Sequence, residues 1–203
     1  MIKNLIFDFG DVFINLDKQG ASENALRLFE LDEFPEELIA INTLYEQGLI
    51  STDEFLEFYV ENFPKLSKKD IIDAWNYILK DFPSHRLDFI KALSEEKKYR
   101  LFLLSNTNEL HIDYIKSHFP FYVEFQSCFE QFYLSHEIHL RKPNTDIFEF
   151  VLNENQLTAS ECLFIDDTKD NTDTAKSLGF HIWNIDEIKE DVAHLLTIKH
   201  ELF

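Results

Sequence analysis

Four short apolar runs recur along the chain, and each is closed by polar residues. They span residues 2–7, 99–104, 162–165 and 180–183. Their length and composition are those of strands buried on both faces of a parallel sheet. Helical periodicity follows or separates these runs at about 85–97, 108–118, 144–155 and 170–178. The alternation predicts an α/β fold with a doubly wound, Rossmann-like parallel sheet, in which functional groups gather at the carboxyl ends of the strands.

Residues 17–80 interrupt this alternation with helical periodicity and no convincing strand. A capping box from Ser51 to Glu54 follows Gly48, which predicts antiparallel helices at 35–47 and 52–62 and a further helix that ends near residue 80. Pro83 disfavours helix at the preceding residue, so residues 81–84 are expected to form a return linker. The sequence therefore predicts a helical cap at 17–80, inserted into an α/β core made of residues 1–16 and 81–203.

The charge of the chain restricts its partners. Its 203 residues include 19 basic and 38 acidic side chains, for a formal charge of −19. Such a field opposes approach to nucleic acid or to an anionic membrane, so we expect neither as a partner. A phosphate ester would meet the same repulsion, so a phosphate site here needs a bound cation and a few placed basic side chains. Nothing in the sequence predicts the oligomeric state.

The two cysteines, Cys128 and Cys162, form neither a disulfide framework nor a zinc spacing, and we expect buried thiols. His136 and His139 are three residues apart rather than four and have no apparent third ligand, so no zinc site is predicted there. The N-terminal apolar run is too short for a signal peptide, and no later run reaches transmembrane length. We expect a cytoplasmic protein.

The first apolar run ends on Asp8, two residues before Gly10. A carboxylate between a buried strand and a glycine turn can act as a nucleophile and relay a phosphoryl group covalently. The third run ends on Asp166 and Asp167, which we expect at the same edge of the sheet. Because Mg²⁺ prefers oxygen ligands, the predicted metal ligands are Asp8, a carboxylate of the Asp166 and Asp167 pair, and the Gly10 backbone carbonyl.

A phosphate clamp is predicted from two other segments. Ser105 closes the second apolar run, and its hydroxyl, with the amide of Asn106, offers donors at a strand-to-helix turn that favours an anion. Lys142 supplies a compact positive charge. Pro143 is expected to open the next helix and to hold this lysine at the rim of the site.

The order and spacing of these segments resemble the haloacid dehalogenase superfamily, with a helical C1-type cap inserted after the first motif. The resemblance covers nearly the whole chain and includes similarity to bacterial glucose-1-phosphate phosphatases, in LSNTN at 104–108, YLS at 133–135, RKP at 141–143, FIDD at 164–167 and DN at 170–171. It implies a Mg²⁺-dependent phosphatase that acts on a small-molecule phosphate ester. Asp8 would be phosphorylated, Ser105 and Lys142 would hold the phosphoryl group, and Asp167, as the preferred direct ligand, would anchor the metal with Asp166.

One position departs from the superfamily pattern, which has a second aspartate two residues after the nucleophile as general acid for the leaving group. This chain has Gly10, and the similar phosphatase subgroup also tends to have glycine there. Loss of a positioned proton donor costs a factor of roughly 10²–10⁴, so we expect a substrate with a good leaving group, such as glucose 1-phosphate. Asp11 is a weaker candidate for the acid, Asn171 for a hydrogen-bonding partner within the site, and His111 for substrate contact.

The helical insert offers candidates for substrate selection. Three residues near the predicted turn could face the site and select the leaving group: Tyr45, Glu46 and Gln47. Other aromatic residues at helical spacing are expected to form the core of the cap: Phe55, Phe58 and Tyr59.

Two other functions are compatible with the same segments. A metal-free haloacid dehalogenase also uses the first aspartate as nucleophile without an acid two residues later. The Asp166 and Asp167 pair argues against it, because two uncompensated carboxylates would raise the pKa of Asp8 and weaken it as a nucleophile. The second alternative is a catalytically degenerate protein that binds a phosphate ligand without turnover.

Overall fold

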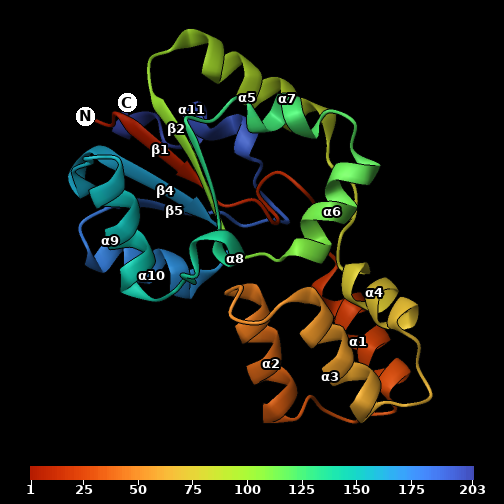
Figure 1. Cartoon of the computed structure of the whole chain (residues 1–203). Helices are drawn as coiled ribbons and strands as arrows, with labels where there is room; N and C mark the ends of the chain where they lie inside the picture. Colours follow the sequence, from red (N-terminus) through yellow and green to blue (C-terminus); the bar gives the residue numbers. More distant parts are fainter.

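The protein is described by a computed structural model that covers all 203 residues. Five parallel strands form one sheet in the order β3-β2-β1-β4-β5 (Figure 1). Their bounds are β1 Asn4–Phe7, β2 Arg100–Ser105, β3 Gln131–Leu134, β4 Cys162–Asp166 and β5 His181–Asn184. The predicted doubly wound parallel sheet is confirmed. Strand β3 was not predicted, because it lies at an edge of the sheet and only Leu134 of its four residues is buried.

Helices cover both faces of the sheet. One face packs against α5 (Ser84–Glu96), α6 (Glu109–His118), α7 (Tyr122–Gln126) and α11 (Leu195–Ile198), and the other against α9 (Thr145–Glu154) and α10 (Lys169–Ser177). A short helix, α8 (Ser135–Ile138), follows β3 directly, and single 3₁₀ turns span 159–161, 192–194 and 200–202. The side chains of β1 alternate between the two layers, since Leu5 and Phe7 belong to one buried cluster and Ile6 to the other. Burial on both faces explains the continuous apolar runs in the sequence.

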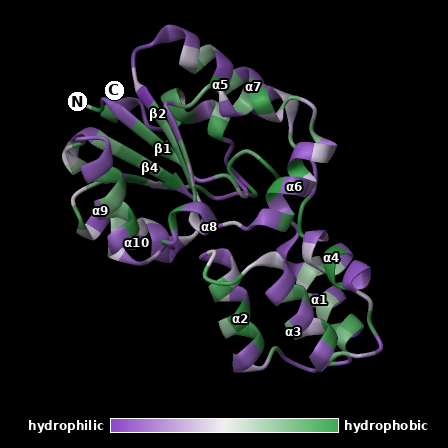
Figure 2. Ribbon diagram, in the orientation of Figure 1, coloured by the Kyte–Doolittle hydropathy of each residue, from purple (hydrophilic) through white to green (hydrophobic).

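The segment between β1 and α5 folds into four helices with a buried cluster of their own. These are α1 (Lys18–Phe29), α2 (Glu36–Glu46), α3 (Thr52–Asn62) and α4 (Lys68–Asn76). Figure 2 shows hydrophobic and hydrophilic residues mixed along these helices. The capping box from Ser51 to Glu54 is present and begins α3, and a second one from Ser67 to Asp70 begins α4. Helix α4 ends at Asn76 rather than near residue 80, because the residues that follow pair with the incoming linker.

The two linkers between the helical unit and the sheet run side by side. The Asn15 N–H donates to the Asp81 carbonyl at 2.9 Å, the Lys80 N–H donates to the Asn15 carbonyl at 3.0 Å, and the Asp17 N–H donates to the Ile78 carbonyl at 2.9 Å. These bonds tie the chain where it leaves the sheet to the place where it returns. The division at residues 17 and 80 stays a prediction.

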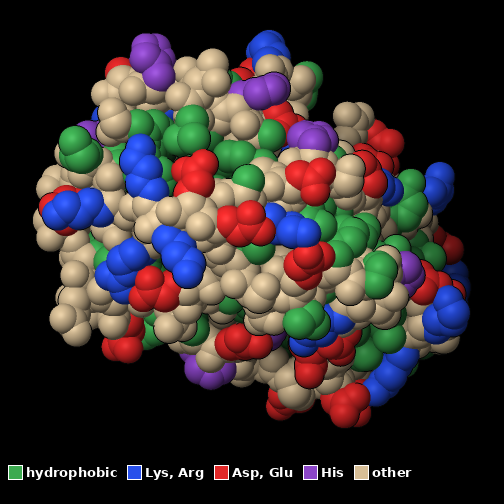
Figure 3. Space-filling model, turned by 90° about the horizontal axis from the view of Figure 1, so that it is seen from above, with side chains coloured by type: hydrophobic (Ala, Val, Ile, Leu, Met, Phe, Trp, Pro, Cys, Tyr) green, Lys and Arg blue, Asp and Glu red, His purple; other side chains and the backbone are tan.

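The surface carries mixed charges. Figure 3 shows acidic and basic side chains interspersed over the face seen from above. Both cysteines are buried and free, as expected. No helix has the combination of length and apolar character that a bilayer crossing requires.

Candidate active site

The parallel register brings the polar ends of three strands to one edge of the sheet. Phe7 pairs with both Leu103 and Ile165, so the residues just beyond these positions converge. Asp8 continues from β1, and its N–H donates to the Ile165 carbonyl at 2.8 Å. The Asp8 side chain is only 12% exposed. The backbone of Asp8 is therefore fixed at this edge of the sheet. Its carboxylate is nearly buried and needs polar partners.

Lys142 supplies the main partner. Its ammonium group donates to Asp8 Oδ1 at 2.8 Å, to Asp166 Oδ2 at 2.7 Å and to the Leu104 carbonyl at 2.7 Å. All three ammonium protons are thus used in a side chain that is 1% exposed. Burial opposes the charge, but the two carboxylates raise the pKa of Lys142 above its ordinary value, so it stays a cation. The prediction that this lysine lies at the rim was wrong, because it is the buried centre of the site.

The backbone of Lys142 is fixed by Asn106. The Asn106 side chain donates from Nδ2 to the Lys142 carbonyl at 2.9 Å, and its Oδ1 accepts from the Lys142 N–H at 3.0 Å. This two-way contact, rather than Pro143, orients the lysine. Pro143 does not open the next helix, since Asn144 precedes α9 as its N-terminal cap residue and the helix begins at Thr145.

Ser105 and Asn106 lie at the carboxyl end of β2, and their role as a phosphate clamp stays a prediction. Ser105 is buried at the end of β2, and its hydroxyl makes one long contact of 3.4 Å with the Asn106 carbonyl. The backbone N–H of Asn106 donates to no acceptor within the protein. A hydroxyl and a free N–H at the end of a strand are suitable donors for an anion.

Asp166 and Asp167 have different surroundings. Asp166 is fully buried and accepts from Lys142, from the Thr168 N–H at 2.8 Å and from Asn171 Nδ2 at 3.0 and 3.1 Å. Asn171 therefore lies in the site as a hydrogen-bonding partner of Asp166. The Asp167 carboxylate is engaged only by Lys18 Nζ, at 2.5 Å. Asp167 thus keeps more free oxygen lone pairs for a further ligand.

The three carboxylates fit a divalent metal. The ligand oxygens of Asp8, Asp166 and Asp167 lie within 4.8 Å of one another, and oxygen donors of this kind are those that Mg²⁺ takes. The Gly10 carbonyl accepts none of the hydrogen bonds of its turn, so its lone pairs are free. Burial raises the pKa of Asp8 to about 7, with Lys142 opposing the rise and Asp166 and Asp167 adding to it. A cation among these groups would restore the ionised carboxylate.

The turn after Asp8 is closely packed at Gly10. A Cβ atom on Gly10 would lie 2.7 Å from the Leu16 Cδ1 atom, so a longer residue there would have to displace the end of the Leu16 side chain. Asp11 has a left-handed backbone with φ of 53°, and its carboxylate accepts from the Leu16 N–H at 2.8 Å and pairs with Lys18 Nζ at 2.8 Å. Asp11 therefore holds the chain that leads into α1.

Lys18 is a site residue that the sequence did not reveal. It is the first residue of α1, and its ammonium group bridges Asp11 and Asp167. An exposed lysine at the start of a helix carries no periodic signal. The nearest indication was Asp17, whose side chain caps α1 by accepting from the Gly20 N–H at 2.8 Å.

The helical unit contacts the sheet edge through the end of α2. Glu46 Oε2 accepts from Arg141 Nε at 2.7 Å, next to Lys142, and the Glu46 carbonyl accepts from the Ser135 hydroxyl at 2.5 Å. Tyr45 does not face the site, contrary to the expectation, because its ring stacks on Phe55 at 4.2 Å between centroids in the buried cluster. Tyr45 is instead part of the packing that supports α2.

His111 joins α6 to α4. Its Nε2 atom contacts the Trp75 carbonyl at 3.1 Å, its Nδ1 atom contacts Asn108 Nδ2 at 3.2 Å, and its ring stacks on Trp75. Burial lowers the pKa of His111 to about 4, so the ring is neutral. With both nitrogens engaged, His111 can contact a substrate only through its carbon edge.

A family model described as haloacid dehalogenase-like hydrolase matches residues 2–179. Among curated proteins, the chain is 31% identical over 195 residues to a D-ribitol-5-phosphate phosphatase of Bacteroides thetaiotaomicron, covering 89% of this chain and 90% of the relative.

Solved structures agree. A HAD family enzyme of Bacteroides thetaiotaomicron in a magnesium complex superposes with a TM-score of 0.84 at 38% identity, covering 96% of this chain and 98% of the other. The same enzyme with magnesium and inorganic phosphate gives 0.83 at 37% identity, covering 96% and 99% of the two chains. A HAD-like hydrolase of Porphyromonas gingivalis gives 0.83 at 30% identity, with 100% and 98% covered. The chain therefore belongs to the haloacid dehalogenase-like hydrolase family.

Proposed function

We propose that this protein is a Mg²⁺-dependent phosphatase that hydrolyses a small phosphorylated metabolite through an aspartyl-phosphate on Asp8. The observation that carries the proposal is the contact of one buried ammonium, that of Lys142, with both Asp8 and Asp166 beside a third carboxylate. The phosphatase activity of the curated relative and the magnesium and phosphate in a neighbouring structure support the same reaction.

The reaction divides into two displacements at phosphorus. Asp8 Oδ1 is held by Lys142, and Oδ2 accepts no hydrogen bond within the protein, which makes Oδ2 the attacking atom. A bond forms between this oxygen and phosphorus while the ester bond breaks, and the leaving alkoxide takes a proton from water, which leaves hydroxide. A second water then attacks phosphorus and gives a proton to this hydroxide, the bond between phosphorus and Asp8 Oδ2 breaks, and phosphate departs with the Asp8 carboxylate regenerated.

The charge of the phosphoryl group is met by this chain's own donors and by a metal. Lys142, the Ser105 hydroxyl and the Asn106 N–H offer positive charge and hydrogen bonds to its oxygens. When bound, Mg²⁺ would act as a Lewis acid that neutralises the charge of the phosphoryl oxygens. The proposed ligands are Asp8, Asp167, the Gly10 carbonyl and Asp166, whose oxygens already accept hydrogen bonds. Asp167 is the preferred direct ligand because only Lys18 engages it.

The absence of an acidic side chain at Gly10 bears on which leaving groups the enzyme accepts. Without an acid at this position the enzyme favours leaving groups that depart unprotonated, which supports glucose 1-phosphate over glucose 6-phosphate. The relative's name points to ribitol 5-phosphate, an ester of a primary alcohol and a poorer leaving group. Turnover of these three esters by the purified protein tests the leaving-group argument, which fails if the 6-phosphate or ribitol 5-phosphate is clearly preferred.

The reaction class is tested with acetyl phosphate and p-nitrophenyl phosphate. We expect hydrolysis that needs Mg²⁺, stops with a chelator and is lost in Asp8→Asn. Halide release from a 2-haloacid that resists the chelator would favour the metal-free dehalogenase. Tight binding of inorganic phosphate without any turnover would favour the degenerate binding protein.

A further inference from the structure

The helical unit forms a partly open cavity of about 230 Å³ between α1, α2, α3, α4 and the start of α6. Nine of its fourteen lining residues are hydrophobic, including rings from three different segments: Phe34, Tyr59 and Trp75. A lining of this kind binds an apolar group better than a polar one, since the lining is desolvated by an apolar occupant at no cost in hydrogen bonds. The mechanism proposed above makes no use of this space.

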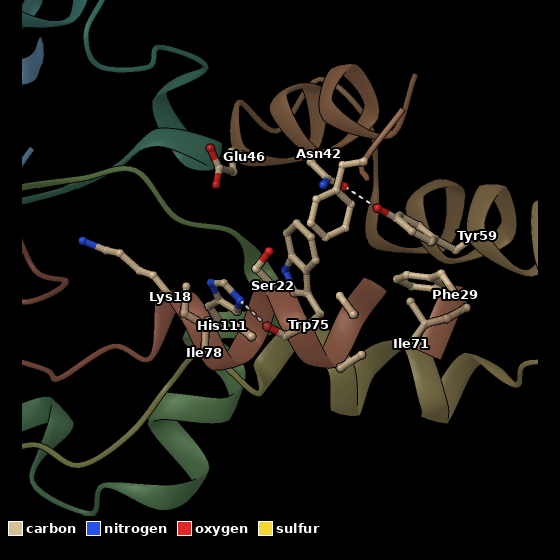
Figure 4. A pocket seen from close by; sticks show the side chains of 14 residues that line it. Lys18, Ser22, Phe29, Asn42, Glu46, Tyr59, Ile71, Trp75, Ile78 and His111 are labelled. Carbon is tan, nitrogen blue, oxygen red and sulfur yellow. Dashed lines mark hydrogen bonds between the residues drawn. The ribbon is translucent and has the colours of Figure 1, made fainter. Parts of the chain in front are cut away.

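The two ends of the cavity differ. Figure 4 shows Lys18 and Glu46 at the end toward the sheet and Phe29, Tyr59 and Ile71 at the opposite end. Lys18 reaches from the cavity wall to the carboxylate of Asp167. Glu46 likewise reaches Arg141, the neighbour of Lys142 in the chain. The polar end of the cavity therefore adjoins the phosphoryl site, where the leaving group of an ester must lie.

Few polar atoms in the cavity are free to bind hydroxyl groups. The Tyr59 hydroxyl already donates to Asn42 Oδ1 at 2.7 Å, and both nitrogens of His111 are engaged. The Ser22 hydroxyl and Asn42 Nδ2 make no hydrogen bond within the protein, and Asn42 lies beside Tyr59, so the uncharged lining leaves only these two donors unused. A polyol with more hydroxyls than these two groups can bind would bury some of them without hydrogen-bond partners, which is unfavourable.

We propose that this cavity binds the leaving group and selects phosphomonoesters in which that group is an apolar six-membered ring, above all an aromatic alcohol. This inference rests on the proposed function and narrows its substrate class. An aryl ester satisfies both constraints of the site, because a phenol, with a pKa of about 10 like that of tyrosine, departs without a general acid. Stacking on the aromatic lining adds to the burial of the ring.

Four esters separate the cavity from the leaving-group effect. Phenyl phosphate has an apolar ring and an acidic leaving group, and cyclohexyl phosphate has the ring alone. Glucose 1-phosphate has a leaving group that is more acidic than a simple alcohol but has no apolar ring. Ribitol 5-phosphate has neither property. We expect KM for both apolar rings to be at least about tenfold below that for glucose 1-phosphate, and kcat/KM for phenyl phosphate to exceed that for ribitol 5-phosphate at least about 100-fold.

A pair of matched variants tests where the ring binds. Ala25 lines the cavity from α1, and Ala25→Leu fills part of it. Ala40 is exposed on α2 and lies outside the cavity lining, so Ala40→Leu makes the same change elsewhere in the helical unit. We expect Ala25→Leu, but not Ala40→Leu, to raise KM for phenyl phosphate at least about tenfold more than KM for acetyl phosphate. Ser22→Leu, at an exposed position of the lining, provides a second filling variant if Ala25→Leu is poorly folded.

The outcomes distinguish the two proposals. Hydrolysis of acetyl phosphate with a ring preference that falls in the filling variants supports the cavity assignment. Hydrolysis of acetyl phosphate without a ring preference, or with the same KM changes in Ala40→Leu as in the filling variants, overturns the cavity assignment and leaves the phosphatase standing. If the protein hydrolyses neither acetyl phosphate nor any of the four esters, both proposals are overturned.

Discussion

Replacing Lys142 with methionine removes the buried cation and keeps a side chain of similar reach. In the native site the ammonium offsets Asp8 and Asp166 at 2.8 and 2.7 Å. The variant leaves two buried carboxylates close together with no counter-charge. Removing one partner from a buried, hydrogen-bonded ion pair costs about 3–5 kcal/mol. We expect Lys142→Met to lose about this much unfolding free energy when a chelator keeps divalent cations away.

The magnitude translates into a measurable melting shift. For a chain of this size, 1 kcal/mol changes Tm by about 2–4 °C, so the expected loss is roughly 6–20 °C. Saturating Mg²⁺ should reduce the loss, because the bound cation supplies the missing positive charge to the same carboxylates. The control is Lys169→Met, which removes an exposed ion pair with Asp173 that is worth about 0–1 kcal/mol.

The assay is thermal and urea unfolding of the native protein and both variants, with chelator and with Mg²⁺. A loss for Lys142→Met that is as small as that of the control would refute the argument that the lysine neutralises the buried pair. A large loss that Mg²⁺ does not reduce would refute the argument that lysine and metal share the same carboxylates.

Three further predictions concern the same edge of the sheet. With a chelator present, the native protein should lose at most about 4 kcal/mol of unfolding free energy as the pH rises from about 4 to 7. The reason is that Asp8, with its pKa of about 7, keeps in the folded state a proton that the unfolded chain releases near 3.8. Urea titrations at several pH values measure this, and an unfolding free energy that rises over that range contradicts it. Asn106→Ala should lower kcat by about 10- to 100-fold, because Lys142 loses both backbone contacts with the amide, and steady-state kinetics with acetyl phosphate provide the check; unchanged kcat would show that Lys142 is held without the amide. Asp11→Asn should cause a small loss of kcat/KM that is equal for phenyl and cyclohexyl phosphate, since the Asp11 carboxylate binds the Leu16 N–H and Lys18. A loss of kcat/KM confined to cyclohexyl phosphate, which has the poorer leaving group, would identify Asp11 as the proton donor.

Much of the candidate site was predictable because its residues follow recognisable strands. Asp8, Ser105 and Asp166 each close an apolar run, and parallel strands bring such ends to one edge. Asn171 was predicted only as a weaker candidate, although the structure places it against Asp166. The role of each residue in catalysis stays a prediction.

Other features escaped because no local pattern encodes them. Strand β3 carries too few buried residues to stand out, and α4 ends early because Leu79 and Lys80 pair with the incoming linker. Lys142 was expected at the rim, since a lysine before a proline resembles a solvated loop. Its burial depends on carboxylates that lie 24 and 134 residues away in the chain.

The sequence by itself determined the layered α/β architecture, the helical insert and the carboxylates at the strand ends. These follow from periodicity, capping and glycine turns, which act over a few residues. Only the tertiary structure decided that Lys142 is a buried counter-ion, that Lys18 reaches Asp167 and that the insert forms a largely apolar, partly open cavity. Each of these depends on how separate elements pack, because electrostatic and hydrophobic free energies are set by neighbours in space rather than in sequence.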